Sequence, residues 1–103
     1  MADFQRVAST GDIPEGEMIT VEVGDAEIVI ANCGGEFLAF QNDCTHKQGP
    51  LGEGMILDGC IVECPFHGGQ FNMKTGEVVA QPPEDPIATY PVQVDGDDIS
   101  LAI

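Results

Sequence analysis

Positive charge is scarce in this sequence. Only Arg6, Lys47 and Lys74 oppose eighteen acidic residues, which gives a formal net charge of −15 over 103 residues. Nucleic-acid binding requires a lysine- and arginine-rich surface for phosphate contacts, so the composition argues against it, and an anionic membrane would repel the chain. The acidic excess favours solubility, and it can also steer a protein toward a basic partner. Composition alone leaves both interpretations open.

Long apolar runs, an export signal and helical periodicity are missing as well. No run of ~18 apolar residues is present that could span a bilayer. Residues 1–6 lack the charged-then-apolar pattern of a signal peptide. We therefore expect a soluble cytoplasmic protein whose cysteine thiols stay reduced. The length predicts one domain, residues 1–103, with a modest core.

Short strand patterns separated by glycine- and proline-rich turns fill most of the chain. This arrangement predicts an all-β protein, an antiparallel sandwich or barrel-like base. Residues 43 to about 73 are expected to form a small β-subdomain inserted between the strands of that base. Strands are expected at residues 4–9, 18–23, 26–32, 36–41, 55–57, 60–63, 70–73, 87–94 and 99–103.

The sequence contains only two histidines, and each stands beside a cysteine. Residues 44–46 read C-x-H, and seventeen residues later residues 64–67 read C-x-x-H. Each short segment thus offers one thiol and one imidazole, so two loops could share one metal centre. The four candidate ligands are Cys44, His46, Cys64 and His67. The other two cysteines, Cys33 and Cys60, have no nearby histidine, and neither is expected to be a ligand.

Three chemistries use these residue types. A structural zinc site can use two cysteines and two histidines, but it usually draws like ligands from one knuckle. A cysteine–histidine nucleophile would need only one such pair. An iron–sulfur centre of the Rieske type places two cysteines on one iron and two histidines on the other. The mixed spacing favours this third chemistry, with a zinc-stabilised protein-binding β-module as the remote alternative.

The two segments resemble the cluster loops of Rieske ferredoxins, in particular the small ferredoxins of bacterial aromatic-ring-hydroxylating dioxygenase systems. The resemblance rests on CTH at residues 44–46 and CPFHGG at residues 64–69. It implies the Rieske fold of three antiparallel sheets with one [2Fe–2S] cluster at a tip. Cys44 and Cys64 would hold the inner iron, and His46 and His67 the outer iron. Residues 82–83, both proline, match the family's loop that covers the cluster.

Four other positions differ from the Rieske proteins of respiratory bc complexes. Gly49 and Phe66 stand where that branch carries two further cysteines, which join in a disulfide. Gly69 and Phe71 stand where it carries a serine and a tyrosine whose hydroxyls donate hydrogen bonds to the cluster sulfurs. Fewer donors leave the reduced cluster less stabilised. We therefore expect a potential near the low end of the Rieske range, roughly −150 mV.

The resemblance implies an electron-transfer component of an aromatic hydrocarbon breakdown system and not an enzyme. Electrons would pass from an NAD(P)H-dependent flavin reductase to the Rieske centre of a terminal ring-hydroxylating oxygenase. An oxygenase site on this chain would need two more histidines. A small subunit of another oxidoreductase, such as a nitrite-reductase-type complex, is the main alternative.

We expect a monomer that docks transiently near the cluster tip. His46 and His67 would form the edge from which the electron leaves. The rim around that edge is expected to contain Lys47, Gln48, Phe66 and Pro82.

Overall fold

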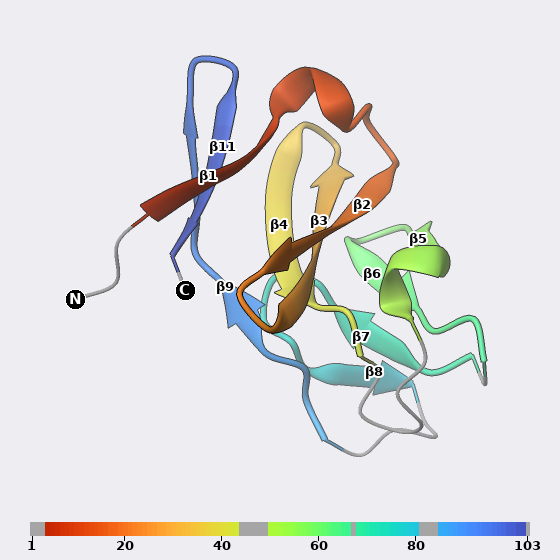
Figure 1. Cartoon of the computed structure of the whole chain (residues 1–103). Coiled ribbons are helices and arrows are strands. Elements are labelled where there is room, and N and C mark those ends of the chain that lie inside the picture. Colours follow the sequence, from red (N-terminus) through yellow and green to blue (C-terminus); the bar gives the residue numbers. More distant parts are fainter. Residues whose placement is uncertain (1–3, 44–49, 67, 81–84, 103) are drawn as a thin grey trace.

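Three antiparallel sheets make up the fold. The computed structural model describes residues 4–43, 50–66, 68–80 and 85–102 (Figure 1). The first sheet contains, in order, β1 (Phe4–Ser9), β11 (Asp98–Ala102) and β10 (Val92–Asp95). The middle sheet contains β2 (Met18–Val23), β3 (Ala26–Cys33), β4 (Glu36–Gln41) and β9 (Thr89–Tyr90). The third sheet contains β5 (Met55–Leu57), β6 (Ile61–Glu63), β7 (Gln70–Asn72) and β8 (Val78–Ala80). The predicted all-β, antiparallel fold class is confirmed.

The middle sheet lies between the other two, and its central strands β3 and β4 place buried side chains on both of its faces (Figure 1). Successive side chains of a strand point to opposite faces, and β3 uses both. Ile28 and Ile30 pack with residues of the first sheet, whereas Val29 and Ala31 pack with residues of the third. Glu27 shares the second face with Val29, but Glu27 is exposed whereas Val29 is fully buried.

The structure therefore has two apolar cores that share the middle sheet. We call the one facing the third sheet the site-side core and the one facing the first sheet the base core. The base core consists of Ala8, Ile13, Ile28, Ile30, Ala39, Ile99 and Leu101. The site-side core consists of Val29, Ala31, Phe40, Leu51, Val62, Cys64, Phe71, Met73 and Ile87. One predicted metal ligand, Cys64, is thus part of a core.

Most predicted strands are present, and the differences have local causes. The strand expected at residues 87–94 is divided into β9 and β10 around Pro91, which has no N–H to donate to a ladder. The sequence reading missed β8, which pairs with β7 across an irregularity between Gln70 and Phe71. It also missed two short 3-10 turns, η1 (Thr10–Asp12) and η2 (Leu51–Glu53).

Cys33 and Cys60 form a disulfide, so the expectation that all thiols stay reduced is wrong for this pair. The fold places the end of β3 against the turn between β5 and β6. The two Cα atoms are 5.8 Å apart, within the range that a disulfide spans. The expectation that neither residue is a metal ligand agrees with this bond.

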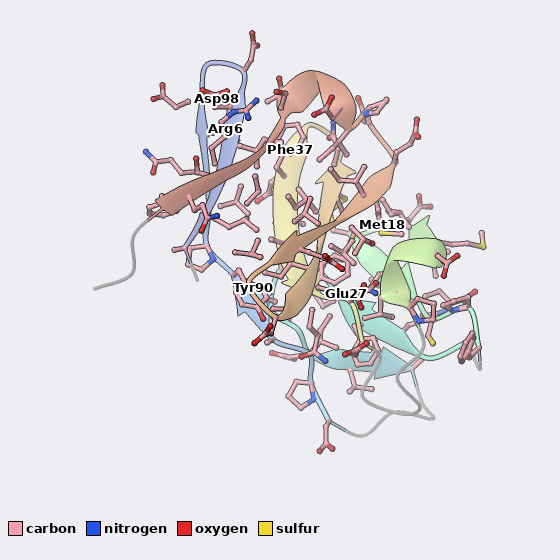
Figure 2. The ribbon with its side chains drawn as sticks, in the orientation of Figure 1. Arg6, Met18, Glu27, Phe37, Tyr90 and Asp98 are labelled. Atoms are coloured by element: carbon pink, nitrogen blue, oxygen red, sulfur yellow. A yellow bond between two sulfur atoms is a disulfide. The ribbon has the colours of Figure 1, made fainter. Side chains whose placement is uncertain are left out.

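Two ion pairs involve the positive residues that the structure describes. Arg6 of β1 contacts Asp98 of β11 at 2.8 Å, and Figure 2 shows the two side chains together at the edge of the first sheet. Lys74 contacts Glu36 at 3.2 Å. All four side chains are more than half exposed, so solvent screens both pairs and each contributes little to stability. No helix in the described part of the chain has the length and apolar character needed to cross a membrane.

Candidate metal centre

Cys64 is the one predicted ligand among the described residues; Cys44, His46 and His67 lie outside them. Cys64 follows β6 directly and is only 3% exposed. Its backbone N–H donates to the carbonyl oxygen of Gly69 at 2.7 Å, and the N–H of Gly68 donates to the carbonyl oxygen of Cys64 at 3.2 Å. These two bonds join Cys64 to Gly68 and Gly69, which follow the C-x-x-H motif. The backbone therefore holds the Cys64 thiol in place at the edge of the site-side core.

Asn42 joins the two ends of the loop, residues 44–49, that contains the C-x-H motif. The sequence pattern did not single this residue out. Its carbonyl oxygen accepts from Leu51 N at 2.7 Å, and its side-chain Oδ1 accepts from Gly52 N at 2.9 Å. Asp43 and Pro50 form an antiparallel bridge beside these bonds. Asn42 is 7% exposed, so its bonds are shielded from competing water. Both ends of residues 44–49 are thereby pinned to the middle sheet.

The segment after the first loop packs near the strand that leads into the second loop. Leu51, at the exit of the first loop, shares the site-side core with Val62 and Cys64. At Gly54 a side chain could not fit, because a Cβ there would overlap the carbonyl oxygen of Glu63, the residue before Cys64. The close approach at Gly54 therefore sets the segment that follows the first loop against the end of β6, which leads into Cys64.

The side chain of Gln41 connects the first loop to the segment that follows the predicted proline loop. Its Nε2 donates to the carbonyl oxygen of Asp43 at 2.6 Å, and its Oε1 accepts from Ala88 N at 2.7 Å. The Gln41 backbone N–H also donates to the carbonyl oxygen of Ala88 at 3.0 Å. In the sequence, Gln41 is an ordinary polar residue just before a ligand motif, and no local pattern indicated this role.

The proline loop starts beside the second ligand loop. Ala80, at the end of β8, pairs with Gln70, which follows Gly69. Residues 82–83 themselves lie outside the described part of the chain. The bases of all three segments are consequently neighbours on the scaffold.

The cysteine pairing limits which residues could bind metal. Because Cys33 and Cys60 are joined, two of the four cysteines can supply thiolates, namely Cys64 and Cys44. The sequence also contains two histidines, whose imidazoles can act as nitrogen donors. Two thiolates and two imidazoles fit a Rieske-type [2Fe–2S] cluster. A cluster of this type moves one electron at a time.

The chain belongs to the Rieske family, because residues 3–91 match the family model described as the Rieske [2Fe-2S] domain. Accordingly it carries one Rieske-type [2Fe–2S] cluster. The chain is 40% identical over 96 residues to the biphenyl dioxygenase ferredoxin subunit of Pseudomonas sp. (strain KKS102). That alignment covers 93% of this chain and 88% of the relative.

Solved structures of dioxygenase ferredoxins are also similar to this chain over almost its whole length. The ferredoxin of carbazole 1,9a-dioxygenase from Nocardioides aromaticivorans IC177 superimposes with a TM-score of 0.93 at 30% identity, covering 98% of both chains. A complex of reduced oxygenase and oxidised ferredoxin in carbazole 1,9a-dioxygenase matches with a TM-score of 0.88 at 35% identity, covering 96% of this chain and 92% of that one. A structure from Mycobacterium tuberculosis described as an NADH-dependent nitrite reductase small subunit shares the fold, but only 16% of the sequence. Its likeness is one of fold alone.

Proposed function

We propose that this chain is the one-electron carrier of an aromatic-ring-hydroxylating dioxygenase system. It would accept electrons from an NAD(P)H-dependent flavin reductase and deliver them to the Rieske centre of a terminal oxygenase. The observation that carries the proposal is the near-full-length match to dioxygenase ferredoxins, one of them in complex with its oxygenase. With the two histidines assigned to the cluster, the chain has no histidine left for an oxygenase iron site.

Cys44 and Cys64 are the proposed ligands of the inner iron, and His46 and His67 those of the outer iron. Residues 43–73 are the proposed cluster-binding subdomain within the single domain 1–103. The hydrogen bonds that fix the chain on either side of the first motif, and those made by Cys64, support this assignment, because they leave both motifs attached to one rigid scaffold.

The proposed docking surface surrounds the histidine edge. Phe66 is 59% exposed although it is large and apolar, which suits a contact that is made briefly and then broken. Lys47, Gln48 and Pro82 complete the proposed rim but lie outside the described residues. The acidic excess would steer the carrier toward basic patches on its partners. We propose a monomer in the cytoplasm, where NAD(P)H is available to the reductase.

Reconstitution tests the proposal. A flavin reductase, this protein and a terminal oxygenase from the same gene neighbourhood are combined with NADH and an aromatic substrate. Hydroxylated product should form with all three components and stop when this protein is omitted. A substitution of Phe66 by Ala should slow electron delivery to the oxygenase and leave the cluster spectrum unchanged. Product formation at the same rate without this protein would overturn the proposal.

A further inference from the structure

The disulfide links two sheets at the opposite end of β6 from the proposed ligand. Cys33 is the last residue of β3 in the middle sheet, and Cys60 stands just before β6 in the third sheet. The bond closes a loop with a sequence separation of 27, which contains the whole first ligand segment, residues 44–49. It is therefore a covalent link between the middle sheet and the third sheet, whose strand β6 leads into Cys64.

The backbone at Cys60 is held in an unfavourable conformation. Cys60 is the one non-glycine residue in the described part of the chain with a positive φ, at 59°. Residues with a Cβ rarely adopt this left-handed region, because the Cβ approaches the backbone carbonyl. The carbonyl oxygen of Cys60 accepts a hydrogen bond from Met73 N at 2.9 Å. The disulfide, this bond and the pairing of Leu57 with Ile61 hold the turn, so breaking the disulfide removes one of its restraints.

A cleft of about 390 Å³ opens beside the disulfide, and Cys33 is among its lining residues. Three glycines also line it, and at each of them a Cβ would meet open space. The absence of side chains at these positions leaves room for an approaching reagent. The cleft is lined by Glu15, Gly16, Cys33, Gly34, Ile56, Leu57, Asp58 and Gly59.

We propose that Cys33–Cys60 is a reversible thiol–disulfide exchange site that takes a dithiol reductant. A thiolate of the reductant attacks Cys33 Sγ, the sulfur–sulfur bond breaks, and Cys60 leaves as a thiolate that takes up a proton. The second thiol of the reductant then attacks the mixed disulfide and releases Cys33. The reductant leaves as a disulfide, and the protein pair has gained two electrons and two protons.

The charge at the cleft selects among reductants. Glu15 and Asp58 line it, and the whole chain carries −15. An anionic monothiol such as glutathione is repelled from this site. It must also react twice in separate collisions, and the mixed disulfide can revert between them because Cys60 remains nearby. A neutral dithiol, or a dithiol protein with a cationic contact surface, avoids both obstacles.

Opening the bond frees the turn before β6 from the hairpin between β3 and β4. Because β6 leads directly into Cys64, the reduced protein should hold its cluster less firmly; this consequence rests on the proposed ligand role of Cys64. The exchange reaction itself involves no cluster atom. The exchange site and its effect on cluster retention can therefore be refuted separately.

The first measurement follows the exchange by mass spectrometry. The holoprotein is incubated anaerobically with dithiothreitol, or with glutathione at equal thiol concentration, then quenched and labelled with a maleimide under denaturing conditions. Peptides with Cys33 and Cys60 should carry no label before reduction and one label each after dithiothreitol. Glutathione should act at least tenfold more slowly. Both cysteines labelled before any reductant, or neither labelled after dithiothreitol, would overturn the exchange site.

The second measurement follows cluster loss to an iron chelator by visible absorbance. Dithiothreitol should accelerate bleaching of the wild-type protein at least tenfold. The control variant Cys33→Ser/Cys60→Ser should bleach fast without dithiothreitol and respond little to it, which isolates the disulfide from any direct attack on the cluster. Equal rates for oxidised and reduced wild type would refute the link to cluster retention even if the variant did not fold.

Discussion

The side-chain bridge made by Gln41 gives a sharp test of how the scaffold supports the first ligand loop. Gln41→Met keeps the length of the side chain and removes both the donor to Asp43 O and the acceptor for Ala88 N. A hydrogen bond contributes a net ~0.5–1.5 kcal/mol to stability. Gln41 is only partly buried, so we take the lower half of that range for each bond. The expected loss is about 1–2 kcal/mol in the free energy of unfolding.

Urea unfolding followed by far-UV circular dichroism measures that loss. In thermal unfolding, the expected fall in Tm is roughly 5–15 °C, because ~1 kcal/mol corresponds to ~4–8 °C in a domain of this size. The matched control is Gln93→Met. Gln93 is exposed on β10, and its side chain makes no hydrogen bond within the described part of the chain. If the two variants differ by less than about 0.5 kcal/mol, the usual range for surface substitutions, the Gln41 side chain does not support the loop.

A second substitution separates the two halves of the bridge. Gln41→Glu keeps an acceptor for Ala88 N but sets a carboxylate oxygen against the carbonyl oxygen of Asp43. The Asp43 contact is the one at the first ligand loop, and both Gln41→Glu and Gln41→Met remove it. Both variants should therefore lose their cluster to a chelator equally readily, and faster than the wild type. Cluster loss at the wild-type rate would show that the Ala88 contact alone matters.

Three further predictions concern stability, potential and docking. Cys33→Ser/Cys60→Ser should cost about 3–4 kcal/mol in urea unfolding, from the loop-closure entropy of a bond with a sequence separation of 27; a loss below about 1 kcal/mol would mean that the tie constrains little. A redox titration should place the cluster potential near roughly −150 mV, and a value above about +100 mV would contradict the inference from Gly69 and Phe71. The rate of oxygenase reduction should fall as salt rises, because the charge of −15 is screened; a rate independent of salt would assign the charge to solubility alone.

The strands were predictable because alternation and turn residues are local signals. Residues 18–23 and 36–41 lie in β2 and β4 with the bounds that the pattern predicts. The burial of β3 on both faces was not predictable in the same way, because Val29 is apolar whichever face it occupies. Only the packing of the third sheet onto the middle one decides that Val29 is buried.

The metal-binding pattern could be predicted because the ligand types are rare and close together in the sequence. The supporting residues could not, because their roles depend on contacts made through the fold. Asn42 and Gln41 look like ordinary polar residues at a strand end, and their partners Gly52 and Ala88 are identified only once the loops are placed. The disulfide was missed for the same reason, since no local signal connects Cys33 to Cys60.

The most direct test of the central claim is anaerobic mixing of the reduced protein with its oxidised oxygenase, followed by rapid-freeze electron paramagnetic resonance. The signal of this protein's reduced [2Fe–2S] cluster should disappear while an equal amount of reduced oxygenase Rieske centre appears, since each cluster carries one electron. A reduced cluster that persists beside an oxidised oxygenase would show that this protein is not the electron donor of that oxygenase.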